Sequence, residues 1–135
     1  MRGNSSSQET IDGLALQRLD LLKIDVEGME CAVLAGAADT LKRLRPVLYV
    51  ENDRRENSTR LISQIIKAGY RLWWDIVPLF NPDNFFGRAE NVFADGMSIN
   101  MLGVPVERPT AISSMPVTGP EDTWRAALAR MRGTA

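Results

Sequence analysis

The segment from Leu21 to Arg54 constrains the fold more than any other part of the sequence. An apolar run over residues 19–25 is followed by a helical pattern over residues 29–44, and a second apolar run covers residues 47–50. A near-continuous apolar run is typical of a strand that is covered on both faces. A strand, helix and strand of this length predict parallel pairing through a right-handed crossover. We therefore expect an α/β fold whose parallel sheet has residues 19–25 as a central strand.

Turn and proline residues mark the two ends of the first predicted helix, and a second helix is predicted after the crossover. The first helix opens after the turn at residues 26–28 and is stopped by Pro46. Its apolar residues recur at helical spacing and predict one buried stripe: Met29, Val33, Ala37, Leu41 and Leu44. Asn57 or Ser58 is the expected cap of the second helix, which closes at Gly69.

The C-terminal part of the sequence predicts two further strands, a long loop and a terminal helix. Aromatic residues mark a strand over residues 70–77, and residues 98–104 form another. Turn-forming residues dominate the segment 78–96 between them, and loops of this length are usually binding loops or lids. Because a loop joins these strands, we expect an antiparallel hairpin at the edge of the sheet. Pro120 is the expected first residue of the terminal helix.

These patterns divide the chain into three parts. Residues 1–8 are polar and are expected to be disordered, whereas residues 9–105 form the domain. Residues 106–135 are predicted to form a Pro/Ser/Thr-rich linker followed by the terminal helix. The sequence leaves open whether this helix docks on the sheet or binds a partner.

Composition excludes several classes of partner and site. The formal net charge is −1 and no basic face stands out, so we expect no nucleic-acid partner. No apolar run approaches the roughly 20 residues that span a bilayer, so we expect no membrane association. The N-terminus lacks the apolar core of a signal peptide, and the single cysteine, Cys31, fits a reducing compartment. We therefore predict a cytoplasmic protein.

The chain contains no histidine, which restricts its chemistry. A Ser-His-Asp or Cys-His site within this chain and a His-ligated metal are both excluded. Acid–base catalysis would depend on Asp, Glu, Lys or Tyr.

Carboxylates follow both strands of the predicted crossover unit. Asp25 and Glu27 come after the first strand, and Glu51 comes at the end of the second. The crevice at the carboxyl ends of parallel strands is where open α/β sheets bind ligands. Neighbouring strands lie about 4.8 Å apart, so residues at their ends can converge on one ligand. We therefore predict that Asp25, Glu27 and Glu51 are the catalytic residues.

Several short blocks occur in a fixed order along the sequence. The central block is KIDVEGME…VLAGA…RPVLYVE, and four later blocks follow up to about residue 105: GYRLWW, FNPDNF, ENVF and SINML. Together these blocks resemble the FkbM-type methyltransferases, which use S-adenosylmethionine. The resemblance implies a class I methyltransferase (Rossmann-like) fold with a seven-stranded doubly wound sheet. The four predicted strands would be its fourth to seventh, with the last one antiparallel.

The resemblance covers only the C-terminal half of such a domain. The glycine-rich turn that binds the methionine moiety and the acidic residue that binds the ribose have no counterpart in the sequence. We therefore expect that the chain alone does not bind S-adenosylmethionine tightly. The alternative is a non-catalytic remnant or an assembly module, which forms a homo-oligomer or pairs with a complementing chain along residues 19–25.

The resemblance also implies roles for individual residues. Asp25, Glu27 or Glu51 would orient or deprotonate a hydroxyl of the acceptor, a sugar, another polyhydroxylated small molecule or a glycan. We predict that substrate is bound by Asn52, Asp75 and Asn84. Asp75 stands where relatives tend to have a histidine, and its carboxylate has the lower proton affinity.

Some of these residues have alternative roles. Glu27 would also suit the N-terminus of the following helix, where negative charge is favourable. Asp25, Glu51 and Asn52 resemble an oxygen ligand set that suits Mg²⁺ or Ca²⁺, although we predict no metal site. Lys23 is expected to pair with a carboxylate such as Glu51.

Overall fold

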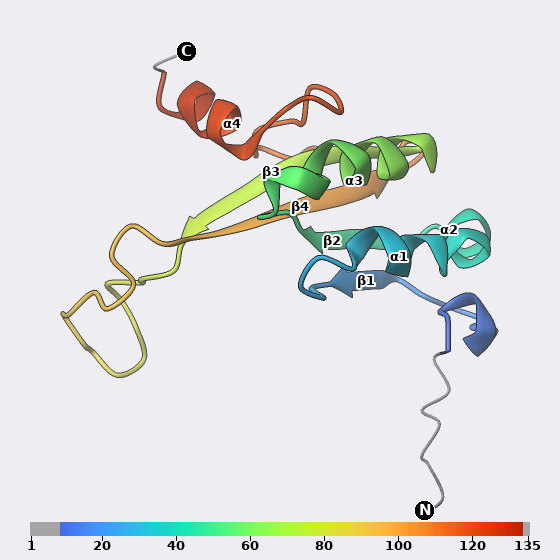
Figure 1. Cartoon of the computed structure of the whole chain (residues 1–135), viewed down its shortest axis with the longest axis horizontal. Coiled ribbons are helices and arrows are strands. Elements are labelled where there is room, and N and C mark those ends of the chain that lie inside the picture. Colours follow the sequence, from blue (N-terminus) through green and yellow to red (C-terminus); the bar gives the residue numbers. More distant parts are fainter. Residues whose placement is uncertain (1–8, 134–135) are drawn as a thin grey trace, which may run out of the picture.

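The computed structural model describes residues 9–133, which form a mixed α/β domain with one four-stranded sheet (Figure 1). The order of the strands in the sheet is β1-β2-β4-β3. Along the chain the elements are η1 Asp12–Leu14, β1 Leu21–Ile24, α1 Glu30–Ala35, α2 Ala38–Leu44, β2 Val47–Glu51, α3 Arg55–Lys67, β3 Tyr70–Pro78, β4 Met97–Pro105 and α4 Trp124–Met131.

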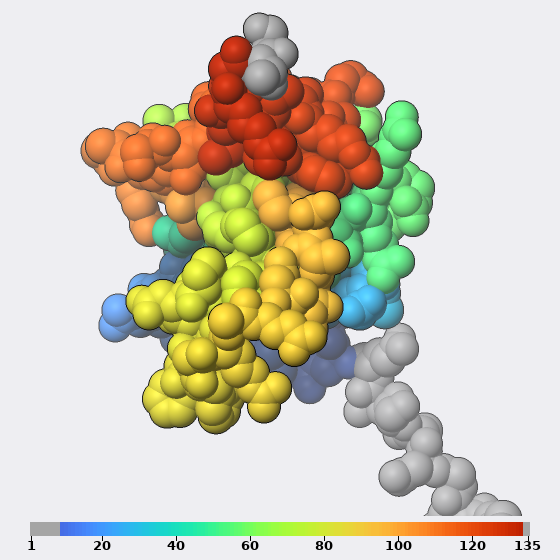
Figure 2. Space-filling view, turned by 90° about the vertical axis from the view of Figure 1, so that its left-hand side faces the viewer, coloured from blue at the N-terminus to red at the C-terminus, as the bar shows by residue number. Residues whose placement is uncertain are grey.

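The pairing of the strands confirms the predicted parallel pair and the predicted hairpin. β1 and β2 are parallel, with Ile24 opposite Val50. β4 lies between β2 and β3 and is antiparallel to both, so Met101 has Val50 on one side and Trp74 on the other. β1, β2 and β3 therefore run in one direction, and their carboxyl ends meet at one edge. The loop between β3 and β4 projects from this edge (Figures 1 and 2).

The hydrophobic core lies on one face of the sheet only. Side chains alternate between the faces of a strand, and every sheet residue of the core belongs to the same alternating set. We call this the covered face; its core residues are Ile24, Leu48, Val50, Tyr70, Leu72, Trp74, Ile76, Ile99 and Met101. Residues of α1, α2, α3 and α4 pack against it, among them Leu34, Leu41, Leu61, Ile62, Ile65 and Ala127. The opposite set faces away from these helices, and we call it the open face.

The prediction that residues 19–25 form a central strand was wrong. β1 is an edge strand in the described part of the chain, and Leu21 on the open face is 56% exposed. The apolar run indicated a strand correctly, but only Ile24 at its end is buried. A run of this length cannot distinguish an edge strand from a central one, because that depends on which segment lies beside it.

The predicted helix over residues 29–44 is divided into α1 and α2 at Gly36 and Ala37. The N-terminal segment causes the division, because the Asp12 N–H donates to the Gly36 carbonyl (2.9 Å). The Asp12 carboxylate then accepts from the backbone N–H groups of Asp39 and Thr40 (3.0 and 2.8 Å) and caps α2. The end before Pro46 is confirmed.

The predicted cap of the next helix was three or four residues late. α3 begins at Arg55, and Arg54 at its N-cap makes no side-chain capping bond. Ser58 is instead the acceptor of a hydrogen bond from Asn52 Nδ2 (3.0 Å). The end is confirmed, since Gly69 adopts the left-handed conformation (φ +83°) that glycine permits.

The terminal segment docks on the sheet, which resolves the alternative left open by the sequence. Residues 115–117 run along the outer edge of β3, where the Trp74 N–H donates to the Met115 carbonyl (2.8 Å). α4 contacts β3 and buries Ala127 fully. Pro120 is not its first residue, because Thr123 caps the helix by accepting from the Ala126 N–H (3.2 Å).

Asp122 fixes this docked segment to the covered face. Its Oδ2 accepts hydrogen bonds from Trp74 Nε1 (3.1 Å), Arg130 (2.8 Å) and the Thr118 N–H (3.1 Å). Burial by itself raises the pKa of Asp122, but the bonds to the ionised carboxylate outweigh it and lower the pKa to about 2. The carboxylate is therefore ionised at neutral pH.

We expect Asp122→Asn to lower the free energy of unfolding by about 2–4 kcal/mol at pH 7, because it removes the charge that binds Arg130 and Trp74. Denaturant unfolding measures the change. Asp20→Asn is the matched control, because it removes an exposed pair with Arg18, and such pairs contribute about 0–1 kcal/mol. Since the pKa is lowered in the folded state, the difference between wild type and Asp122→Asn should shrink as the pH falls from 4 toward 2. Equal effects of the two substitutions at pH 7 would contradict the role of Asp122.

Candidate functional site

A row of polar side chains crosses the open face near the carboxyl ends of β1, β2 and β3. Glu51 lies opposite Asn100, and Asn100 lies opposite Asp75. Asp25 follows directly after β1, one position beyond the pair Ile24–Val50, and so adjoins Glu51. We call Asp25, Glu51, Asn100 and Asp75 the polar row. Two predicted catalytic residues, Asp25 and Glu51, are thus brought together.

Glu51 is the residue of the polar row whose pKa is raised by its surroundings. Its half-buried position raises its pKa, and the negative charge of Asp53 raises it further. Protonated Glu51 also donates a hydrogen bond to Asp25, and the total effect is a pKa of about 7. A carboxyl group with this pKa exchanges protons near neutral pH, which an ordinary glutamate does not do.

Tyr49 and Asp75 form a hydrogen-bonded pair beside Glu51. The Tyr49 hydroxyl donates to Asp75 Oδ2 at 2.6 Å. Burial and the negatively charged Asp75 raise the pKa of Tyr49 to about 12, so the phenol keeps its proton. Asp75 therefore has a fixed donor in this structure, and its other carboxylate oxygen remains to accept from a ligand.

The structure confirms that Lys23 pairs with a carboxylate, and it gives Glu27 an ion-pair partner in place of a capping role. Lys23 pairs with Asp25 (3.5 Å) rather than with Glu51, because both side chains lie on the open face of one strand. Glu27 makes no capping bond to α1 but accepts from Arg54 Nη2 at 2.8 Å. Its backbone is left-handed (φ +54°), and its charge still contributes to the raised pKa of Glu51.

Two predicted substrate-binding residues lie outside the polar row. Asn52 directly follows Glu51, so its side chain lies on the covered side, where it is 2% exposed and donates to Ser58. Asn84 lies in the loop between β3 and β4, where its side chain bonds the backbone of Asn81 and Arg88. Asn84 therefore holds the loop together in this structure.

Sequence reasoning missed Asn100, which lies at the centre of the row. It is 8% exposed, and its side chain donates to Ser98 Oγ (2.8 Å). The signal for it was the strand pattern of residues 98–104, but only the register of β4 against β2 shows that it adjoins Glu51.

The polar row does not line the best-formed pockets of residues 9–133. Five of these pockets have linings that contain none of Asp25, Glu51 and Asp75. Within residues 9–133, no three or more acidic or cysteine side chains are grouped so as to hold a metal ion.

No described helix combines the length and apolarity that a membrane crossing requires.

A comparison with protein-family models gives one match. The model described as "Methyltransferase FkbM domain" matches residues 6–72, about half of the chain. The matched part contains β1, β2 and α3 with the residues Asp25, Glu27 and Glu51. No curated protein and no solved structure matches the chain.

We expect Glu51→Gln to become more stable relative to wild type as the pH rises. The pKa of Glu51 is raised on folding, so its contribution to stability is fully present below about pH 4.5 and is lost as the pH rises through about 7. Between pH 5 and pH 8 the stability difference should shift by about 2 kcal/mol in favour of Glu51→Gln. Urea unfolding at both pH values measures this shift.

Two features make this experiment specific. The chain has no histidine, so no imidazole titrates in the same window. Glu56→Gln, at an exposed position in the first turn of α3, is the control and should show no such shift. If the difference in free energy of unfolding between wild type and Glu51→Gln did not change with pH, the pKa of Glu51 would not be raised on folding.

Proposed function

Because this chain belongs to the FkbM methyltransferase family, we propose that it takes part in methyl transfer from S-adenosylmethionine to an oxygen of a sugar or another polyhydroxylated acceptor. The observation that supports the proposal most directly is the position of Glu51 in the matched part of the chain, where burial and neighbouring carboxylates raise its pKa to about 7. It adjoins Asp25 at the carboxyl ends of two parallel strands.

Glu51 is the proposed general base. In its ionised form it accepts the proton of the acceptor hydroxyl: the O–H bond breaks, the proton moves to the carboxylate, and the electron pair stays on the acceptor oxygen. A base works best when its pKa lies near the working pH, which the value of about 7 provides. Burial and Asp53 contribute most to holding this pKa above that of an isolated glutamate, and Asp25 and Glu27 raise it further.

Other residues of the open face would orient the acceptor. Asp75 keeps an oxygen for a sugar hydroxyl, and Asn100 lies between it and Glu51. Trp73 is half-buried on the same face and offers a ring for stacking, with Arg71 5.4 Å from its centroid. Trp74 is 1% exposed and belongs to the core, so it is not available to a ligand.

The described residues do not provide a fitting pocket for S-adenosylmethionine. No glycine-rich turn follows a strand within residues 9–133, and the turn after β1 has a single glycine, Gly28. A Cβ at Gly28 would approach the Arg54 side chain to 3.1 Å, so this glycine accommodates Arg54. We therefore assign no residue of the chain to the cofactor.

We expect the full chain to bind S-adenosylmethionine only weakly, with a dissociation constant well above the micromolar range. Isothermal titration calorimetry measures the affinity, with buffer injections as the blank. A micromolar constant would contradict this expectation and would require a donor site that the described residues do not form.

We expect Glu51→Gln to lower kcat for methyl transfer by about 10²–10⁴-fold, because it removes the general base. The assay uses the full chain, millimolar S-adenosylmethionine and a panel of sugars, with detection of the methylated product. In wild type the rate should rise with pH through about 7, and this dependence should be absent from the residual activity of Glu51→Gln.

Glu56→Gln is again the control and should retain wild-type activity. Absence of methyl transfer to every acceptor, or an equal rate for wild type and Glu51→Gln, would contradict the proposed function.

A second candidate function is assembly, in which the chain pairs with a complementing chain or a second copy. It is favoured by β1, whose outer edge has no neighbouring strand among the described residues and carries exposed Leu21. Unpaired strand edges readily pair with other chains. The methyl-transfer assay distinguishes the two candidates, because an assembly module gives no methylated product.

A further inference from the structure

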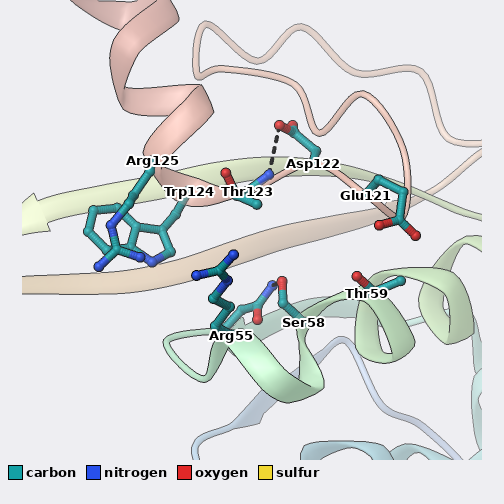
Figure 3. Close-up of a pocket in the computed structure, with 9 residues that line it drawn as sticks. Arg55, Ser58, Thr59, Glu121, Asp122, Thr123, Trp124 and Arg125 are labelled. Atoms are coloured by element: carbon teal, nitrogen blue, oxygen red, sulfur yellow. Dashed lines mark hydrogen bonds between the residues drawn. The ribbon is translucent and has the colours of Figure 1, made fainter.

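A pocket of about 410 Å³ lies on the covered side of the sheet, between the start of α3 and the turn that leads into α4 (Figure 3). This volume is in the range of small-molecule sites. Two separate segments line it, and they meet only in the folded chain. The lining residues are Asn52, Arg55, Ser58, Thr59, Glu121, Asp122, Thr123, Trp124 and Arg125.

The N-termini of two helices converge on this pocket. α3 begins at Arg55 and has 13 residues, and α4 begins at Trp124 and has 8. No side chain caps α3, so N–H groups of its first turn remain without a side-chain acceptor. Each helix directs the positive end of its dipole toward the pocket, which favours a negatively charged ligand.

Both helices also contribute an arginine to the lining. In Figure 3 the guanidinium of Arg55 extends from α3 toward Trp124 and Arg125 on α4. Arg125 lies over the Trp124 ring, 4.3 Å from its centroid. Neither arginine forms an ion pair with a carboxylate within residues 9–133. Two guanidinium groups are thus left for an external anion.

The two acidic residues of the lining do not cancel this positive charge. Asp122 is paired with Arg130, and it also accepts from Trp74 and Thr118. Glu121 lies at the far end of the pocket from Arg125, above Thr59 (Figure 3). The part of the pocket between Arg55 and Arg125 is therefore positive.

Asn52 adds a second and independent indication of a ligand. Its side chain lines the pocket although the residue is 2% exposed, and its Oδ1 has no hydrogen-bond partner among the described residues. A buried amide oxygen without a donor is unfavourable, by roughly 1–3 kcal/mol. The hydroxyls of Ser58 and Thr59 lie on the same wall. This wall suits the hydroxyl groups of a ligand, whereas the arginines suit its charge.

We propose that this pocket binds an anionic, hydroxylated small molecule of the size of a sugar phosphate. Arg55 and Arg125 hold the phosphate between the two helix N-termini, and Asn52, Ser58 and Thr59 bond the sugar hydroxyls. The site is distinct from the polar row, because Asn52 and Glu51 lie on opposite sides of β2. The inference therefore does not depend on methyl transfer.

The test measures binding of glucose 6-phosphate, inorganic phosphate and glucose to the full chain by NMR titration at low salt. We expect saturable binding of glucose 6-phosphate, weaker binding of phosphate, and no saturable binding of glucose. Arg55→Gln and Arg125→Gln should each weaken glucose 6-phosphate binding about tenfold, the loss of one charge-assisted hydrogen bond.

Arg60→Gln is the matched control, since Arg60 lies on α3 but lines a different pocket. It should leave the affinity unchanged, and circular dichroism should show that all three variants are folded. Binding that is equally weakened by Arg60→Gln, or that is unchanged in Arg55→Gln and Arg125→Gln, would overturn the site. Equal affinities for phosphate and glucose 6-phosphate would overturn the role of Asn52 and the hydroxyls.

Discussion

Burial of a single face of the sheet is the constraint on which the rest of this structure depends. Strand side chains alternate, so placing Ile24, Val50 and Met101 under the helices forces every intervening residue onto the open face. The polar row exists for this reason: Glu51, Asn100 and Asp75 occupy the alternate positions of three paired strands. A shift of one residue in the register of β4 would move Asn100 to the core and disrupt the row.

The same alternation separates the two sites. Glu51 and Asn52 are adjacent in the chain, yet one faces a group of carboxylates and the other a pocket lined by arginines. Burial and the neighbouring carboxylates disfavour the ionised form of Glu51 and raise its pKa to about 7. The surroundings of Asn52 favour an anion, because two helices begin there. The two sides of one strand end thus have different electrostatic surroundings.

The C-terminal segment contributes more than its linker-like composition suggests. Asp122 anchors it through Trp74 and Arg130, and this anchor brings the start of α4 to the start of α3. Residues 115–117 extend the sheet along the edge of β3, which leaves β1 as the strand edge without a neighbour in the described residues. Among the described residues, a further strand could therefore pair only along the outer edge of β1.

The sequence by itself determined the local elements and the family. Apolar periodicity, Pro46 and Gly69 mark strands and helix ends, and the ordered blocks identify the FkbM methyltransferase family, because these signals depend on neighbouring residues only. It also placed Asp25 and Glu51 together, since parallel strands joined by a crossover end at the same edge. Only the tertiary structure decided that β1 is an edge strand, that Asp12 divides the helix at Gly36, and that Asn100 joins the row. Each of these depends on a contact between segments distant in the chain, and no local pattern of residues encodes which distant segment will supply it.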